Sequence, residues 1–519
     1  MPTIVVETFG FDRIERKAIS GTVIPLGFSI AGKFLNRETG MSKQTRRKFL
    51  KMTTGSAAAL PLMKAFPTTI LTSLNEQTPT GKASVHLTTA DHRYSPSASL
   101  VWQSADRANA GDTIILGGIS SKQPILGFGA ALTDAACYVI SQLPETERER
   151  LLQELFHPDQ LGLSVCRLCI GSSDYARTMY SYDEGDPDPE LSRFSIAHDR
   201  EYILPILRRA RQINSNLFLL ASPWSPPGWM KDNNSMLGGT LRKRYLGPYA
   251  NYIVKFLQAY DAERVAIDAV TPQNEVDTDQ DSRMPACLFP QEIEVEYVSK
   301  HLGPAIEKAG LKTKIWLLDH NYNLWGRAIA ELDDERVRKY TKSIAWHGYI
   351  GQANWVQRVF AAYPDAEMYW TEGGPDIVDP DYARDWAKWS KTFCEILRNG
   401  LRCIIGWNLA LDENGKPNIG PFPCGGVVTV HSKNHEIIRS GQYWAFAHYS
   451  RAFRRSSTMV RSGGEIKDVY HVVAATPDGT HAAVVTHTGT VARTVWIQQG
   501  KNAIEAPLPP DSVTTLTWK

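Results

Sequence analysis

An α/β fold is predicted for this 519-residue chain because strand-like and helix-like segments alternate between residues 121 and 450. Eight parallel strands that each lead into a helix, over about 300 residues, are the pattern of a (β/α)8 TIM barrel. A doubly wound open sheet is the alternative, but no Gly-x-Gly-x-x-Gly motif follows an early strand. The strand-like runs are 125–129, 163–170, 217–221, 266–270, 314–318, 343–346, 367–370 and 403–407.

Helix-like segments lie between these runs. Their apolar residues recur at helical spacing, so each segment can turn one apolar face toward a barrel of strands. In such a barrel, the loops that follow the strands build the binding site. The helix-like segments are 145–156, 200–213, 248–260, 290–309 and 385–398.

The two ends of the chain are β-like. Residues 81–120 and 451–519 contain short runs in which apolar and polar residues alternate, punctuated by turns such as Pro-Asp-Gly and Thr-Gly. We predict that these runs pair into a β-sandwich attached to the side of the barrel. Such a domain can bind polysaccharide, although a rigid structural role is the favoured interpretation. The runs are 97–103, 112–117, 469–474, 481–487, 494–498 and 512–519.

The composition is that of an ordinary globular protein. The chain is 43% apolar and 22% charged with a net charge of +2, so no basic excess indicates nucleic acid. Seven Cys residues without short regular spacing do not make a disulfide framework, and Cys166 and Cys169 are interpreted as core thiols. The 14 Trp and 20 Tyr favour a sugar-binding protein, since pyranose rings stack on aromatic side chains, although core packing will use most of them.

Metal and cofactor chemistry is not predicted. The chain lacks a His-Glu-x-x-His motif. His86, His320 and His448 are scattered, and such histidines serve packing or hydrogen bonding more often than metal binding. We therefore expect neither a metal nor another cofactor.

The N-terminal region has the features of an export signal. Arg46 and Arg47 precede Phe-Leu-Lys and a weakly apolar run, as in twin-arginine signals. The run is too short and too interrupted to span a bilayer permanently. Because such signals lie at the extreme N-terminus, we interpret Met41 as the true start of the protein. Residues 1–40 are then an extension from a mis-assigned start, and residues 41–80 are the signal and its linker. We expect export to the periplasm or exterior of a bacterium.

Two strand-like stretches carry glutamates. Glu275 closes the stretch 269–276, and Glu372 lies in the stretch 367–374. If the strands lie side by side, both carboxylates face one cleft, where one can protonate a glycosidic oxygen while the other attacks the sugar. Each glutamate alone could equally cap a following helix. The residues at the other strand ends favour the catalytic interpretation: Asp134, Arg167, Asp174, Trp224, Asn274, Asp319, His320, His347, Tyr349, Trp407 and Asn408.

Four longer motifs occur in order along the chain. They are Gly-Phe-Gly-Ala-Ala-Leu-Thr-Asp at 127–134, Ala-Ser-Pro-Trp-Ser-Pro-Pro at 221–227, Val-Thr-Pro-Gln-Asn-Glu at 270–275 and Trp-Asn-Leu-Ala-Leu-Asp at 407–412. Together they resemble glycoside hydrolase family 30, the family of the acid β-glucosidase that cleaves glucosylceramide. The resemblance extends from Leu126 to the C-terminus. It implies a retaining β-glycosidase on a barrel with a side-attached β-sandwich.

The resemblance also implies roles for individual residues. Glu275 would be the acid/base, Glu372 the nucleophile, and Asn274 the amide that binds the sugar 2-hydroxyl. By the same matching, Asp174 and Trp224 would hold hydroxyls of the innermost sugar, and Arg167 would orient the nucleophile. The residues that would line the pocket are His347, Tyr349 and Trp407.

Two departures from the family pattern concern the substrate. Val276 stands where the family has proline, and residues 415–428 resemble members that act on β-1,6-glucans more than the mammalian enzyme. The leading hypothesis is a β-glucosidase of the glucosylceramidase type, with an endo-β-1,6-glucanase as the alternative. A catalytically silent carbohydrate-binding protein is disfavoured because Asn274, Glu275 and Glu372 are all present. The expected partner is a β-linked glucoside, glucan or glycolipid.

A retaining mechanism predicts both the spacing and the charge of the two glutamates. Their carboxyl groups should lie about 5–5.5 Å apart. The negative charge of Glu372 should raise the pKa of Glu275, and Arg167 should keep Glu372 ionised.

Overall fold

The computed structural model of the chain describes residues 79–120 and 123–519. The predicted N-terminal extension, the twin-arginine signal and most of the linker lie outside these residues. Among the residues described, no helix is both long and apolar enough to cross a membrane.

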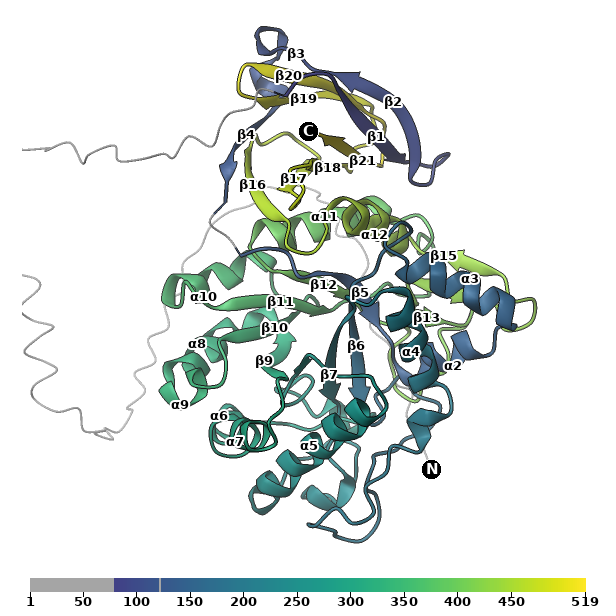
Figure 1. Ribbon diagram of the computed structural model, residues 1–519, viewed down its shortest axis with the longest axis vertical. Coiled ribbons are helices and arrows are strands. Elements are labelled where there is room, and N and C mark those ends of the chain that lie inside the picture. Colours follow the sequence, from purple (N-terminus) through teal and green to yellow (C-terminus); the bar gives the residue numbers. More distant parts are fainter. Residues whose placement is uncertain (1–78, 121–122) are drawn as a thin grey trace, which may run out of the picture. The chain divides into compact units, whose positions relative to one another are not determined.

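Eight parallel strands form a closed barrel (Figure 1). Successive strands are neighbours, and the last closes on the first through the pairing of Cys403 with Gly127. This confirms the predicted barrel. Its strands are β5 Gly127–Ala131, β6 Val165–Ile170, β7 Phe218–Pro223, β8 Ala269–Val270, β9 Lys314–Asn321, β10 Ser343–His347, β11 Glu367–Glu372 and β12 Cys403–Gly406.

Side chains fill the inside of the barrel. Trp316 of β9 and Tyr369 of β11 stack with ring centroids 3.7 Å apart, and alternate residues of the other strands pack around them. The approach of β5 to β6 requires glycine at position 129, because a Cβ there would lie 1.5 Å from the carbonyl oxygen of Val165. The barrel is therefore a packed core, and its chemistry must lie at the strand ends.

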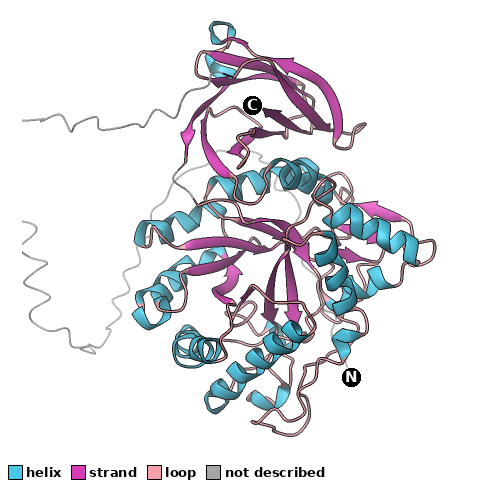
Figure 2. Cartoon of the chain, in the orientation of Figure 1, coloured by secondary structure: helices cyan, strands magenta, loops and turns pink. Residues whose placement is uncertain are grey.

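Helices surround the barrel strands (Figure 2). Thr133 caps the first of them by accepting a hydrogen bond from the amide of Ala136. The predicted helix at 290–309 is divided, because the π-helical segment Tyr297–Leu302 separates α6 from α7. The α-helices are α2 Asp134–Ser141, α3 Glu145–Phe156, α4 Ile203–Ile213, α5 Leu246–Ala262, α6 Gln291–Glu296, α7 Gly303–Lys308, α8 Trp325–Asp333, α9 Glu335–Arg338, α10 Gln357–Ala362, α11 Trp386–Arg398 and α12 Gly441–Ala452.

A ten-stranded sheet combines strands from both ends of the described chain. The first strand, β1, pairs antiparallel with the last, β21, and β4 lies between β16 and β19. These pairings confirm the predicted contribution of both ends to the β-sandwich. The strands are β1 Lys82–Thr88, β2 Ser95–Val101, β3 Gln103–Ser104, β4 Thr113–Ile119, β16 Thr458–Gly463, β17 Val469–Ala475, β18 His481–His487, β19 Arg493–Gln499, β20 Asn502–Leu508 and β21 Ser512–Trp518.

The sheet is bonded to α11 and α12. Nε1 of Trp386 in α11 donates to the carbonyl of Asp511 at 2.8 Å. In α12, His448 contacts Thr515 of β21 at 2.7 Å through Nδ1 and Thr88 of β1 at 2.8 Å through Nε2. A small sheet of β13 Ala410–Leu411, β14 Val428–Val430 and β15 Ile437–Arg439 precedes α12.

All seven cysteines are free. Cys166 is fully buried, as expected of a core thiol, whereas Cys169 is partly exposed. The prediction that the chain has no disulfide framework is therefore confirmed.

Candidate active site

A pocket of about 620 Å³ lies at the carboxyl ends of the barrel strands. Seven of the predicted site residues line it: Asp174, Trp224, Asn274, Glu275, Tyr349, Glu372 and Trp407. The other two, Arg167 and His347, are fully buried and contact the pocket glutamates.

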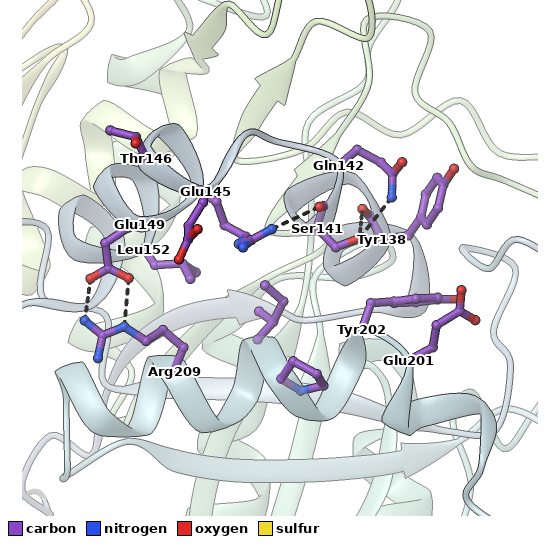
Figure 3. Close-up of a pocket in the computed structure, with 13 residues that line it drawn as sticks. Tyr138, Ser141, Gln142, Glu145, Thr146, Glu149, Leu152, Glu201, Tyr202 and Arg209 are labelled. Carbon is purple, nitrogen blue, oxygen red and sulfur yellow. Dashed lines mark hydrogen bonds and ion pairs between the residues drawn. The ribbon is translucent and has the colours of Figure 1, made fainter.

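A second hollow, of about 930 Å³, lies between α2, α3 and α4 (Figure 3). Its charged side chains bond to each other, as where Nε of Arg209 donates to Glu149 at 2.8 Å. None of the predicted site residues lines it. The pocket at the strand ends is therefore the candidate active site.

The two glutamates reach the pocket from different backbone conformations. Glu372 is the last residue of β11, so strand geometry directs its side chain. Glu275 follows β8 and has φ of 50°, in the left-handed region that is strained for a glutamate. Its amide donates to the carbonyl of Asp319 at 3.0 Å, which fixes this conformation. Strain held in this way is typical of functional positions.

Arg167 joins the nucleophile candidate to its surroundings. Its Nη1 contacts Oε2 of Glu372, and its Nη2 donates to Oδ1 of Asn274 and to Oδ2 of Asp319, both at 2.6 Å. The guanidinium is fully buried, so these charge-assisted bonds hold Glu372 and Asn274 in fixed positions.

Asp319, near the end of β9, was predicted among the strand-end residues of the site but was given no role of its own. It is fully buried and accepts hydrogen bonds from Ser222 at 2.8 Å, Thr271 at 2.9 Å and Thr371 at 2.8 Å. It also pairs with Arg167. An acid at a strand end was the available signal in the sequence, but only the three-dimensional contacts show that Asp319 organises the floor of the site.

His347 lies between the two glutamates. Its Nδ1 is 3.5 Å from Oε1 of Glu275, and its Nε2 is 3.9 Å from Oε2 of Glu372 and 3.1 Å from Oδ1 of Asp319. The hydroxyl of Tyr349 donates to Oε1 of Glu372 at 3.0 Å. Glu372 is therefore held by donors on both of its oxygens.

Two tryptophans form an aromatic wall. Trp224 and Trp407 stack with centroids 5.1 Å apart, and the guanidinium of Arg167 lies 4.6 Å above the Trp224 ring. Asp174 lines the same pocket, and its buried Oδ1 has no hydrogen-bond partner among the described residues. An aromatic wall beside a free polar atom suits a sugar ring, which has apolar faces and hydroxyl edges.

Comparison with known proteins identifies the family. The Glycosyl hydrolase family 30 TIM-barrel domain matches residues 125–453. The chain belongs to glycoside hydrolase family 30. This family 30 chain is 33% identical over 356 residues to an endo-1,6-beta-D-glucanase of Neurospora crassa, covering 66% of this chain and 72% of that protein.

Two further relatives of this family 30 protein differ in their named activities. The lysosomal acid glucosylceramidase of Mus musculus is 27% identical over 438 residues, covering 80% of this chain and 85% of the relative. The solved structure of an endo-beta1,6-glucanase has a TM-score of 0.76 at 28% identity and covers 85% of this chain and 99% of its own. The chain is thus a glycoside hydrolase with both glucanase and glucosylceramidase relatives.

The charges of this family 30 site differ from the expected ones. Burial acts to raise the pKa of Glu275, but the adjacent His347 and His320 outweigh it, so the pKa of Glu275 is lowered. Burial raises the pKa of Glu372, and the charges of Glu275 and Asp319 add to this effect, although His347 and Arg167 oppose it. The expectation that the pKa of Glu275 is raised is therefore wrong for the unliganded site.

The proton of the site resides on His347 instead. Burial alone would lower the pKa of His347, but Glu372, Asp319 and Glu275 raise it to about 9. Burial and the charges of both glutamates raise the pKa of Asp174 well above its usual range, which favours a protonated carboxyl that can donate a hydrogen bond.

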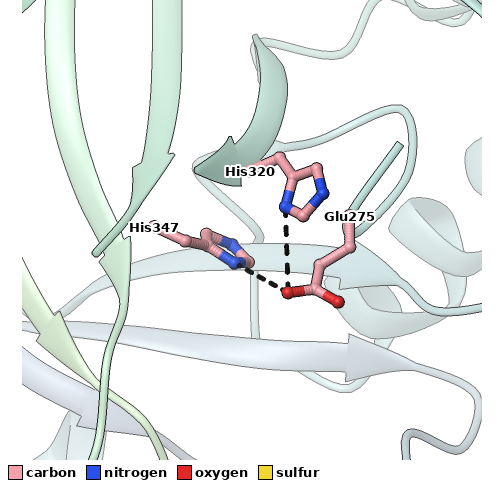
Figure 4. Close-up of side chains that lie close together, drawn as sticks. All are labelled: Glu275, His320 and His347. Carbon is pink, nitrogen blue, oxygen red and sulfur yellow. Dashed lines mark ion pairs between the residues drawn. The ribbon is translucent and has the colours of Figure 1, made fainter. Parts of the chain in front are cut away.

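Three side chains of the site could hold a metal ion. Glu275, His320 and His347 each place one ligand atom within 4.8 Å of the others (Figure 4). Their donor set is two imidazole nitrogens and one carboxylate oxygen, which suits zinc and related ions.

Proposed function

We propose that the protein is a retaining β-glycosidase in which Glu372 is the nucleophile and Glu275 the acid/base. The observation that supports this is that the two carboxylates share one pocket but have different neighbours. Glu372 faces the donors Arg167 and Tyr349, which favour an ionised nucleophile, whereas Glu275 faces His347, which carries a proton.

In the first step, an oxygen of Glu372 bonds to the anomeric carbon while the bond from that carbon to the leaving oxygen breaks. Glu275 supplies the proton that the leaving oxygen takes, and it draws this proton from Nδ1 of His347 across the 3.5 Å contact. In the second step, water gives a proton to Glu275 and attacks the anomeric carbon. The bond to Glu372 breaks, and the proton returns to His347.

The remaining pocket residues would hold the innermost sugar. Asn274 is bonded to Arg167, so its amide nitrogen is available to a sugar hydroxyl. The carboxyl of Asp174 presents its free Oδ1 to the same pocket. The stacked Trp224 and Trp407 supply the apolar wall.

We propose a β-1,6-linked glucan as the substrate. Phe422, Pro423 and Cys424, which lie in the segment that resembles β-1,6-glucan-cleaving members, line the pocket. Tyr175 holds this segment, because its hydroxyl donates to the carbonyl of Phe422 and accepts from the amide of Cys424, both at 2.7 Å. The named activities of the Neurospora relative and of the solved glucanase support the same choice.

A glucosylceramide-like β-glucoside is the second candidate. Ile350 and Phe422 line the pocket and are 57% and 39% exposed, so an apolar aglycone would find apolar side chains at the entrance. The glucosylceramidase relative supports this candidate.

One stereochemical measurement tests the retaining mechanism, and a panel of substrates tests the proposed substrate. Proton NMR of the first-formed product from a β-glycoside should show the β-anomer, and a first-formed α-anomer would exclude retention. Among pustulan, laminarin, an aryl β-glucoside, an aryl β-xyloside and glucosylceramide, pustulan should give the highest kcat/KM. A higher value on glucosylceramide would select the second candidate.

A further inference from the structure

Three potential metal ligands meet on one side of the pocket (Figure 4). Nδ1 of His347 lies 3.5 Å and Nδ1 of His320 lies 3.8 Å from the same oxygen, Oε1 of Glu275. Ligands that each lie 2.0–2.1 Å from a tetrahedral zinc ion are about 3.3 Å apart. Small rotations of the side chains would therefore bring the three atoms to binding distance.

The ring of His347 is held in an orientation that suits such an ion. Nδ1 of His347 is fully buried and has no hydrogen-bond partner among the described residues. The other ring nitrogen, Nε2, lies 3.1 Å from Oδ1 of Asp319, which Arg167 holds in turn. A carboxylate behind the imidazole of a metal-binding histidine fixes the ring and directs its other nitrogen, once deprotonated, at the ion.

The surrounding charges also favour a cation. The carboxylates of Asp319 and Glu372 lie within 3.9 Å of His347 and add negative charge to that of Glu275. An entering ion must displace the proton that His347 carries. The site should therefore prefer Zn²⁺ or Cu²⁺, which bind imidazole strongly, over Mg²⁺ or Ca²⁺, which prefer oxygen ligands.

Access and a fourth coordination position are both available. Glu275 and His320 line the pocket, whereas His347 is buried behind them. An ion can therefore enter from the pocket, and water from the pocket can complete its coordination.

We propose that Glu275, His320 and His347 bind a divalent transition metal ion such as Zn²⁺, and that the bound ion switches off hydrolysis. The inhibitory half of this inference depends on the proposed role of Glu275. A carboxylate that coordinates the ion can neither give a proton to the leaving oxygen nor take one from water. The metal site is thus an off-switch, and no step of the hydrolysis requires the ion.

Direct binding tests the site without reference to activity. Metal-free protein should bind one Co²⁺ per chain with the visible absorption of a four-coordinate ion, and Zn²⁺ should displace it. The variant His320→Ala should weaken Zn²⁺ binding at least about tenfold in competition with a chromophoric chelator. Asn323→Ala, which alters a residue of the same pocket that is not one of the three ligands, should bind as the wild type does. Equal binding by His320→Ala and the wild type would overturn the site.

Inhibition is then measured relative to the uninhibited rate of each variant. Zn²⁺ should inhibit the wild type competitively with substrate, a chelator should restore activity, and the inhibition constant should rise about tenfold or more in His320→Ala. Metal binding at the three residues without inhibition would overturn the switch. Binding to a protein that hydrolyses no glycoside of the panel would leave the metal site intact and refute the proposed function. A circular-dichroism melt of each variant shows that it is folded.

Discussion

Oδ1 of Asp319 lies 3.1 Å from Nε2 of His347, and both side chains are fully buried. This contact determines which edge of the imidazole faces Glu275. Asp319 therefore acts as a positioning residue, because it orients the group that exchanges a proton with the acid/base candidate.

Replacing Asp319 by Asn should impair activity and stability together. The imidazole of His347 loses its anionic partner and Arg167 loses one counter-ion, so kcat should fall by about 10–100-fold. The unfolding free energy should fall by about 3 kcal/mol, because a buried charge loses its pair. Initial rates and urea unfolding measure the two effects.

The matched control is Glu154→Gln. It breaks an ion pair with Arg439, 2.6 Å long, outside the pocket. This variant should lower stability and leave kcat unchanged. An unchanged kcat for folded Asp319→Asn would remove the positioning role.

The two glutamate variants should fail in different ways. Glu372→Ala removes the nucleophile, so hydrolysis should stop and azide should restore turnover as an α-glycosyl azide. Glu275→Ala should still form the glycosyl-enzyme from substrates with good leaving groups, and azide should then yield a β-glycosyl azide. NMR of the products distinguishes the anomers, and the opposite pairing would exchange the two roles.

Trp224 serves substrate binding and packing at once, since it is 2% exposed yet lines the pocket. Trp224→Phe should keep an aromatic face and lower kcat/KM by an amount equivalent to about 0.5–1.5 kcal/mol. Trp224→Ala should in addition destabilise the fold by about 3–5 kcal/mol. Kinetics and thermal melts separate the effects. Wild-type kcat/KM for a folded Trp224→Phe variant would restrict Trp224 to packing.

Stability should decrease in acid because of His448. Burial lowers the pKa of His448 well below its usual value, and the charges of His86 and Arg451 lower it further. Below a pH of about 6.5 the unfolded chain binds a proton that the folded chain does not, so stability falls by up to about 1.4 kcal/mol per pH unit.

His448→Gln should be less stable than the wild type at pH 7.5, because the hydrogen bonds to Thr88 and Thr515 are weakened. Because glutamine does not titrate, the variant should lose less stability than the wild type between pH 6.5 and pH 4.5. Urea unfolding at several pH values measures this slope. His92→Gln, at an exposed histidine, is the control. An unchanged slope in His448→Gln would exclude this histidine as the source.

Export should depend on the arginine pair. We propose that the chain uses the twin-arginine route, and the sequence at 45–51 supports this. Changing Arg46 and Arg47 to Lys keeps the charge but removes the recognised side chains, so precursor should accumulate in the cytoplasm. Translation from Met41 should leave export intact. Normal export of the double-Lys protein would contradict the route, and loss of export from the Met41 start would show that residues 1–40 matter.

The barrel could be predicted from the sequence because its signal is local and repeated. Each strand is an apolar run, and five of the helical regions have their own periodicity. Helices α8 and α12 were not predicted, nor was the π-helical break at Tyr297–Leu302. β1, β16 and β20 were not predicted. β20 contains Pro507, which interrupts a strand pattern, and β1 has its partner β21 at the far end of the chain. Long-range pairing of this kind has no local signature.

The part of the site that has a local signal in the sequence was predicted. Glu275 and Glu372 end apolar runs, which is visible in the sequence. The central position of Asp319 and the lowered pKa of Glu275 depend on where Arg167 and His347 point. Those directions arise from the packing of β6, β9 and β10 and have no counterpart in a linear motif.

The pairing of β1 with β21 also bears on the order in which the chain can be completed during synthesis. The barrel closes with β12, so its strands can meet before the final segments have left the ribosome. β1 and β4 are made first, yet their partners β21, β16 and β19 are among the last strands to emerge. The open edges of β1 and β4 are aggregation-prone surfaces until then. The edge of β1 can therefore be covered by its partner strand only after β21, which ends at Trp518, has been synthesised.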